Sequence, residues 1–203
     1  MNLEQLLIDG AKDMDIELDN KQAAKLINYL ELIIKWNKTY NLSAIRNMEE
    51  GVKKHLIDSL SVIKYIGDKS LLDVGAGAGL PGIVISIMKP NLAVSVIDTV
   101  GKKCRFMQFA KTQLDLKNLT VINDRVENYH PEQCFSQITS RAFAEVGKTL
   151  KLTQHLLCNN GRYLLMKGDK FANESVKGVD VVAHQLSVPY VSDNRYLLEI
   201  QSN

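Results

Sequence analysis

Residues 71–83, LLDVGAGAGLPGI, constrain the fold of this chain more than any other segment. An apolar run delivers Asp73, and Gly75, Gly77 and Gly79 then turn the chain tightly toward a following helix. Glycine adopts positive φ at little cost and lets a ligand lie directly against the backbone. A strand, a glycine turn and a helix in this order predict a ligand site at the carboxyl edge of an open α/β sheet.

After residue 69, short apolar runs alternate with segments of helical periodicity. The apolar runs lie near 70–74, 93–97, 119–123, 136–140, 162–166, 179–188 and 196–200. The expected helices lie near 80–89, 101–116 and 145–157, and we expect each of them to be amphipathic. This alternation predicts a parallel sheet with helices on both faces. The last two runs leave no room for a crossover helix, so we expect them to form an antiparallel hairpin.

The first 68 residues predict helices and no strands. Asp19 is placed to cap a helix that continues to about Asn37, and a second helix is expected from about Met48 to Tyr65. We therefore divide the chain into a helical N-terminal extension, residues 1–68, and a Rossmann-like core, residues 69–203. The fold class is α/β, with a mostly parallel seven-stranded sheet that ends in an antiparallel hairpin.

Two classes of cofactor fit the glycine turn. Gly77, Gly79 and Gly82 form the GxGxxG pattern of dinucleotide folds. Asp98 ends the next strand, where it can accept hydrogen bonds from a ribose diol, as the acidic residue of those folds does. The order D-x-G-x-G-x-G from Asp73, the long helical segment before the turn and the lack of a second domain for a hydride acceptor favour S-adenosylmethionine. The sequence thus favours a class I methyltransferase over an NAD-dependent dehydrogenase.

The motifs that the sequence lacks limit which atoms could accept the methyl group. None of the four prolines adjoins another proline or precedes a cysteine. The [ND]PP[YF] loop of many amino-nitrogen nucleic-acid methyltransferases and the Pro-Cys nucleophile of cytosine-C5 methyltransferases are therefore missing. Guanine N7 remains among the possible targets, and it attacks the sulfonium methyl without losing a proton. Such an enzyme needs no general base and has to align the two reactants, and orientation alone lowers the activation barrier by about 7–11 kcal/mol.

Two arginines are the candidate catalytic residues. Arg125 follows the third expected strand and Arg141 follows the fourth, so both belong at the carboxyl edge of the sheet. A guanidinium there can bind a phosphate, the carboxylate of the donor or guanine O6 through two hydrogen bonds. The alternative for each is an ordinary surface arginine.

Composition limits the possible partners. The net charge is only +2, from 25 basic and 23 acidic side chains, so RNA contact must depend on local basic patches. No apolar run approaches the roughly 20 residues of a membrane span, and the N-terminus lacks a secretory pattern. We expect a cytoplasmic, monomeric protein with no membrane association.

The cysteines and histidines predict neither a disulfide nor a metal site. Cys104, Cys134 and Cys158 are widely spaced, and the four histidines show no metal-ligand spacing. We expect three buried, reduced thiols.

Six segments together resemble the ribosomal RNA small subunit methyltransferase G family, also called GidB. They are NKTYNLS at 37–43, HLIDSL at 55–60, LLDVGAGAGLPGI at 71–83, IDTVGKKCRF at 97–106, DRVEN at 124–128 and SRAFAEV at 140–146. The resemblance implies methyl transfer from S-adenosylmethionine, with S-adenosylhomocysteine as the product, to N7 of guanine 527 in the decoding-region loop of bacterial 16S rRNA. The substrate would be the free rRNA, the small subunit or an assembly intermediate.

The resemblance also implies two groups of site residues. The donor site would contain Asp73, Gly75, Ala76, Gly77, Gly79, Leu80, Asp98, Thr99, Val126, Glu127 and Arg141. Within it, Asp98 would hold the ribose, Val126 and Glu127 would lie against the adenine, and Arg141 would reach the methionine end of the donor or the target guanine. The RNA-binding residues would be Asn41, His55, Lys102 and Lys103, with Arg125 helping to shape the substrate site. For His55, a packing or helix-capping role is the alternative.

Two other functions remain open. A small-molecule methyltransferase would share the donor site, but the basic residues clustered at 102–111 and at 35–54 argue against it. A nucleotide-binding module without catalysis would share the fold, but the presence of Asp98, Arg125 and Arg141 argues against it.

Overall fold

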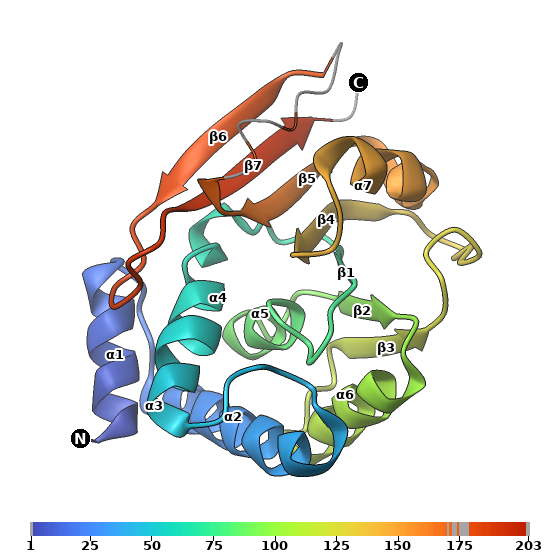
Figure 1. The fold of residues 1–203 in the computed structure, drawn as a ribbon. Helices are drawn as coiled ribbons and strands as arrows, with labels where there is room; N and C mark the ends of the chain where they lie inside the picture. The colour runs from blue at the N-terminus through green and yellow to red at the C-terminus, as the bar shows by residue number, and fades with distance from the viewer. Residues whose placement is uncertain (1, 170, 172–173, 175–178, 202–203) are drawn as a thin grey trace.

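The computed structural model describes residues 2–169, 171, 174 and 179–201, and a seven-stranded sheet forms its centre (Figure 1). The strands are β1 (Leu71–Val74), β2 (Val94–Asp98), β3 (Leu119–Asn123), β4 (Phe135–Arg141), β5 (Leu157–Lys167), β6 (Val181–Leu186) and β7 (Arg195–Gln201). Their order in the sheet is β3-β2-β1-β4-β5-β7-β6. The first five strands are parallel, and β7 runs antiparallel to both β5 and β6. The expected fold class is confirmed.

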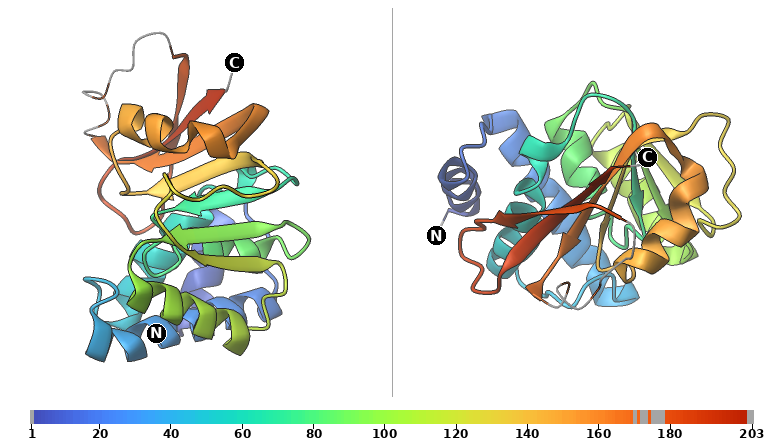
Figure 2. Two further views of the ribbon diagram at one scale, coloured as in Figure 1. Left: turned by 90° about the vertical axis from the view of Figure 1, so that its right-hand side faces the viewer. Right: turned by 90° about the horizontal axis from the view of Figure 1, so that it is seen from above.

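The two faces of the sheet are covered unequally. The N-terminal helices share one buried cluster with α5 (Gly82–Met88) and α6 (Gly101–Gln113), while α7 (Val146–Thr153) and the 3-10 turn η3 (Gln154–Leu156) pack on the other face. Figure 2 shows this layering and the hairpin of β6 and β7 at the end of the sheet away from α6. No helix in the described part of the chain is long and apolar enough to cross a membrane.

Helix α5 is not amphipathic, contrary to the expectation. Residues 82–87 are all buried. The reason is that α2 and α4 pack against α5 on the side away from the sheet. A helix enclosed on all sides needs no polar face.

The N-terminal helices support the glycine turn directly. Helix α1 spans Leu3–Asp13 and α2 spans Asn20–Tyr40, and Asp19 caps α2 as expected through a reciprocal bond with Gln22. On α2, the fully buried Tyr29 donates a hydrogen bond of 2.7 Å to the carbonyl of Ala78 within the turn. The extension thus fixes part of the ligand site as well as covering the sheet.

The expected continuous helix from Met48 to Tyr65 is wrong in detail. The segment divides into α3 (Met48–Gly51), the π-helix η1 (Val52–Ile57), α4 (Asp58–Leu60) and the 3-10 turn η2 (Ile63–Tyr65). In the π-helical part the carbonyl of Lys54 accepts a hydrogen bond from Arg141, 87 residues away. The spacing of apolar residues in the sequence does not reveal a tertiary contact of this kind. π-Helical turns are frequent at functional sites.

The expectation of three free thiols is also wrong. Cys134 and Cys158 form a disulfide, whereas Cys104 is free and buried. In the pairing of β4 with β5, Phe135 lies opposite Leu157, which brings the adjoining cysteines to a Cα separation of 5.0 Å. This proximity arises from strand pairing, and the spacing in the sequence does not reveal it.

Candidate active site

The glycine turn has the backbone conformation that its sequence predicts. Gly75, Gly77 and Gly79 have φ values of 66°, 63° and 95°. A Cβ atom on Gly75 would also lie 2.5 Å from Cδ2 of Phe143, so the position lacks both the conformational and the steric room for a side chain. The backbone N–H of Gly77 donates to Oδ2 of Asp98 at 2.9 Å, which joins the turn to the end of β2.

A cavity of about 390 Å³, here called the Asp98 cavity, lies beside this turn. Its lining comprises Gly75, Ile97, Asp98, Thr99, Val100, Lys103, Asp124, Arg125, Val126, Glu127, Ala142, Phe143, Ala144, Lys148 and Leu152. Asp98 is 7 % exposed and its carboxylate is fixed by the N–H groups of Gly77 and Val100. An oriented carboxylate beside a glycine turn and an apolar wall fits a ribose with an attached base and sulfonium.

The expected donor residues lie in four different places in the structure. Those in the wall of the Asp98 cavity are Gly75, Asp98, Thr99, Val126 and Glu127. Ala76, Gly77, Gly79 and Leu80 belong to the turn itself, and Ala76 and Leu80 are buried in the core. Asp73 lies beneath the turn, and Arg141 lines a neighbouring cavity instead.

Asp73 stabilises the turn from below. Its side chain is fully buried, Oδ2 accepts the N–H of Gly82 at 2.7 Å, and Oδ1 has no hydrogen-bond partner among the described residues. Burial raises the pKa of this carboxyl group from 3.8 to about 7. Asp73 therefore keeps its proton to a much higher pH in the folded protein than in the unfolded chain.

Replacing Asp73 with asparagine should change how stability depends on pH. In the wild type, the unfolded carboxyl ionises near its ordinary pKa while the folded one stays protonated until about pH 7, so wild-type stability falls relative to Asp73→Asn as pH rises through this window. At about 1.4 kcal/mol per pKa unit, the upper limit of the change is about 4 kcal/mol. Urea unfolding of both proteins at pH 5 and pH 8 measures the part of this change that lies above pH 5, at most about 3 kcal/mol. A difference in stability that does not vary with pH would contradict the shifted pKa.

A second cavity of about 520 Å³, here called the Arg141 cavity, adjoins the first. Its lining comprises Lys54, His55, Asp58, Arg141, Ala142, Phe143, Ala144, Met166, Lys167, Gly168, Glu174 and Arg195. Residues 142–144 line both cavities and separate them. The site therefore has two adjoining compartments, as a reaction between two bound molecules requires.

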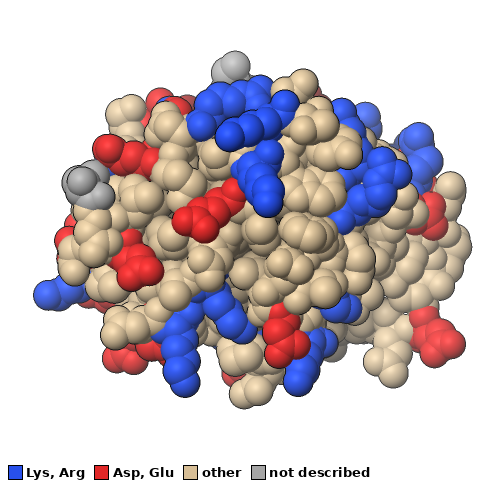
Figure 3. All heavy atoms as spheres, turned by 90° about the horizontal axis from the view of Figure 1, so that it is seen from below, with Lys and Arg blue, Asp and Glu red and all other residues tan. Residues whose placement is uncertain are grey.

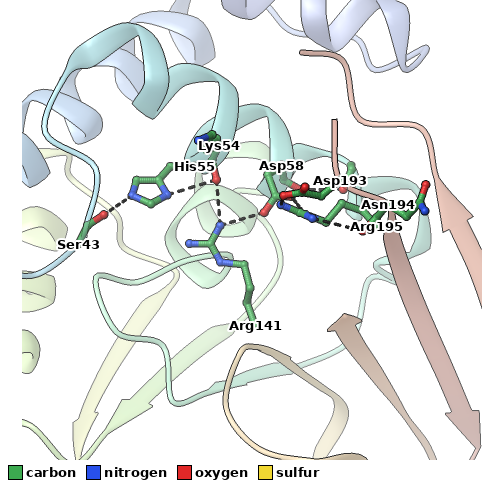
Figure 4. Close-up of polar contacts among 9 residues, drawn as sticks. Ser43, Lys54, His55, Asp58, Arg141, Asp193, Asn194 and Arg195 are labelled. Atoms are coloured by element: carbon green, nitrogen blue, oxygen red, sulfur yellow. Dashed lines mark hydrogen bonds and ion pairs between the residues drawn. The ribbon is translucent and has the colours of Figure 1, made fainter. Parts of the chain in front are cut away.

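Arg141 points across its cavity to the π-helical segment, as Figure 4 shows. Its Nη1 donates to Oδ2 of Asp58 at 3.0 Å and to the carbonyl of Lys54 at 3.3 Å. The other oxygen of Asp58 accepts from Nε of Arg195 at 2.9 Å. One buried carboxylate thus holds two arginines in a single wall.

His55 is a neutral, packed histidine in the same wall. It is 8 % exposed, its Nε2 lies 2.6 Å from Oγ of Ser43, and its Nδ1 lies 3.3 Å from the carbonyl of Lys54. Burial, followed by the charge of Arg141, lowers its pKa to about 4. These contacts agree with the packing alternative, although the ring does line the cavity.

Arg125 and Arg141 do not meet. Arg125 is 66 % exposed at the rim of the Asp98 cavity, where its Nη2 lies 3.1 Å from Oε1 of Glu127. The two arginines share the carboxyl edge of the sheet, as expected, but line different compartments.

The expected RNA-binding residues other than the buried His55 are spread over the surface. Asn41 ends α2 in the left-handed conformation and accepts a hydrogen bond from Arg46, Lys102 is exposed on α6, and Lys103 reaches to 3.9 Å from Asp98. Figure 3 shows the face that carries α2 and α6, where Lys and Arg side chains gather in the upper part of the view. Lys53 and Lys54 in the π-helical segment pair with Glu49 and Glu50, which reduces the net positive charge of that segment's surface.

Sequence reasoning missed Asp58, Phe143, Lys167 and Arg195. Lys167 ends β5, and Arg195 begins the antiparallel β7, so both lie at the carboxyl edge, and this topology was a usable signal. Lys167 donates to the carbonyl of Ala144 and to Glu174, each at 2.7 Å. Within the described residues, no group of three or more His, Cys, Asp or Glu side chains is arranged to hold a metal ion.

A family model described as GidB, rRNA small subunit methyltransferase G, matches residues 22–195. The chain belongs to this family. A ribosomal RNA small subunit methyltransferase G from Ruthia magnifica is 70 % identical over 199 residues, which covers 98 % of this chain and 97 % of the relative. The relative of the same name from Methylobacillus flagellatus is 42 % identical over 200 residues, with 97 % of each chain covered.

Solved structures with low sequence identity support the fold. A SAM-dependent methyltransferase from Aquifex aeolicus has a TM-score of 0.55 at 19 % identity, covering 72 % of this chain and 90 % of that one. The N-methyltransferase NodS from Bradyrhizobium japonicum, in complex with S-adenosylhomocysteine, has a TM-score of 0.54 at 11 % identity, covering 88 % and 98 %. This member of the rRNA small subunit methyltransferase G family thus has the class I methyltransferase fold.

Proposed function

We propose that this methyltransferase transfers a methyl group from S-adenosylmethionine to N7 of guanine 527 in 16S rRNA. It would act as a cytoplasmic monomer on the free rRNA, the small subunit or an assembly intermediate. The observation that supports N7 is the lack of an available base in the described wall of the Arg141 cavity. Asp58 is bound by two arginines, Glu174 is bound by Lys167, and His55 is held at both ring nitrogens. Guanine N7 is a target that needs no base, since its lone pair is already free.

The Asp98 cavity fits the donor. Asp98 offers two carboxylate oxygens for the ribose hydroxyls, the Gly75 backbone allows close approach, and Val126 supplies an apolar surface for the adenine. S-adenosylmethionine supplies the methyl group when bound there. The role of the protein is to align the acceptor with that group, which is worth on the order of 7–11 kcal/mol.

The Arg141 cavity is the proposed acceptor compartment. Nε and Nη2 of Arg141 donate no hydrogen bond to any residue that the structure describes, so this edge of the guanidinium is free to bind oxygen atoms of the target nucleotide. Phe143 and Met166 add apolar surface for the base. The proposed contacts to flanking RNA are Lys102 and Lys103 on α6, Asn41 at the end of α2, and Arg125 at the rim of the Asp98 cavity.

Methyl transfer from labelled S-adenosylmethionine to 30S subunits that lack this modification, followed by nucleoside analysis, tests the proposal. We expect one 7-methylguanosine, at guanine 527 of 16S rRNA. Free 16S rRNA and assembly intermediates, tested in parallel, identify the preferred substrate form. Label in another nucleoside, or at another guanine, would contradict the proposed target while leaving rRNA methylation in place.

A further inference from the structure

We propose that Asp58 is a positioning residue, which holds Arg141 and Arg195 side by side so that the free edge of Arg141 faces the acceptor nucleotide. The inference rests on rRNA being the acceptor in the Arg141 cavity, but it does not depend on guanine N7 being the methylated atom. Asp58 lies in the HLIDSL segment, at the first residue of α4 after the π-helical turn.

The contacts of Asp58 are shared evenly between the two arginines. Oδ2 accepts from Nη1 of Arg141 at 3.0 Å and Oδ1 accepts from Nε of Arg195 at 2.9 Å. The Asp58 side chain is 5 % exposed, and the arginines are 23 % and 24 % exposed. Charge-assisted bonds of this kind, largely shielded from solvent, hold a side chain in one orientation more firmly than surface pairs do.

The orientation leaves the useful part of Arg141 free. Asp58 and the carbonyl of Lys54 both occupy Nη1, on the side of the guanidinium turned to the helices. Nε and Nη2 form the opposite, side-on edge, which binds two oxygen atoms at once. Without Asp58, Arg141 would keep only the Lys54 carbonyl as a partner among the described residues.

The charge of Asp58 is needed in this wall for a second reason. Arg141, Arg195 and Lys167 all line the cavity, and two adjacent guanidinium groups repel one another unless an anion lies between them. Figure 4 shows Asp58 in that place. A base that acquires positive charge on methylation also binds better in a wall whose cations are already partly neutralised.

The arrangement unites three distant parts of the chain. Asp58 lies in the N-terminal extension, Arg141 ends β4 and Arg195 begins β7, at sequence separations of 83 and 137 residues from Asp58. Asp58 therefore couples the helical extension and the C-terminal hairpin to the strand that ends between the two cavities.

Asp58→Asn tests the proposal, because it keeps the shape of the side chain and removes its charge. We expect the single-turnover rate of methyl transfer to rRNA to fall about 100-fold, the effect of a misplaced binding group. Binding of a 16S rRNA fragment, measured with S-adenosylhomocysteine present, should weaken about 10-fold. Donor affinity should stay within about twofold, because the Asp98 cavity does not include Asp58.

Glu199→Gln is the matched control. Glu199 is also a carboxylate that bridges two basic side chains, Arg162 at 2.8 Å and His184 at 3.0 Å. None of these three residues lines either cavity. This variant should retain the wild-type rate and RNA affinity. An equal loss in both variants would show a general stability effect and would overturn the proposal.

A double-mutant comparison separates positioning from mere structural support. If Asp58 acts through Arg141, adding Asp58→Asn to Arg141→Met should change the rate by less than about twofold. The assignment would be overturned if the rate losses of the two single variants multiplied in the double variant. It would also be overturned if Asp58→Asn kept the wild-type rate and RNA affinity. If the wild-type enzyme methylated an atom other than guanine N7, only the proposed target would be refuted. If the wild-type enzyme transferred no label, the comparison of RNA affinities would still decide the role of Asp58.

Discussion

Arg141→Met should abolish most methyl transfer to 16S rRNA while leaving donor affinity nearly unchanged. Arg141 lines the proposed acceptor compartment and is absent from the wall of the Asp98 cavity, although family resemblance left it between the methionine end of the donor and the target guanine. Loss of a preorganised donor of hydrogen bonds at a reacting group costs about 100- to 1,000-fold in rate. Methionine retains the length and apolar stem of the side chain, so the cavity wall stays filled.

Single-turnover methylation and calorimetric titration with S-adenosylhomocysteine measure the two effects separately. Arg162→Met is the control, because Arg162 is similarly shielded, at 29 % exposed, and is bound to Glu199 and the carbonyl of Tyr65 outside both cavities. It should methylate at the wild-type rate. If Arg141→Met instead lost donor affinity and kept its rate at saturating donor, Arg141 would belong to the donor site.

Asp98→Ala should have the opposite signature, with donor binding lost first. The carboxylate is the group in the Asp98 cavity best placed to accept both ribose hydroxyls, and it also anchors the N–H groups of Gly77 and Val100. Losing charge-assisted bonds to the ribose should cost about 3 kcal/mol, which weakens donor binding roughly 100-fold. High donor concentration should restore much of the methylation rate, in contrast to Arg141→Met.

Calorimetry and the donor dependence of methylation measure this effect. Asp68→Ala is the control, since Asp68 is 98 % exposed and its side chain forms an ion pair only with Lys89 among the described residues. Asp98→Asn should fall between the wild type and Asp98→Ala, because its amide oxygen still accepts one hydrogen bond. Donor affinity unchanged in Asp98→Ala would show that the ribose is held elsewhere.

The sheet was predictable because its signals are local. Apolar runs and turn residues identified each strand, and the short connection before β7 predicted the antiparallel hairpin. The π-helical turn at Val52–Ile57 and the burial of α5 were not predictable in this way. Both depend on what packs against them: Arg141 on the Lys54 carbonyl, and α2 and α4 on α5.

The residues of the proposed donor site were easier to bring together from the sequence than those of the proposed acceptor compartment, for the same reason. Gly75 and Asp98 come from one βαβ unit, and the spacing within such a unit is set by its geometry. The acceptor wall collects Asp58, Arg141 and Arg195 from three separate elements. No periodicity links these positions, so only the folded chain reveals that one carboxylate binds both arginines.

By itself, the sequence determined the order of the strands along the chain, the turn at Gly75 and the carboxylate at Asp98, and it favoured S-adenosylmethionine over a dinucleotide. Each of these follows from neighbouring residues and the conformations they allow. The tertiary structure decided that Cys134 meets Cys158, that His55 is neutral and packed, and that Asp58 lies between two arginines. These properties arise from proximity and exclusion of water between residues distant in the chain, which only folding brings about.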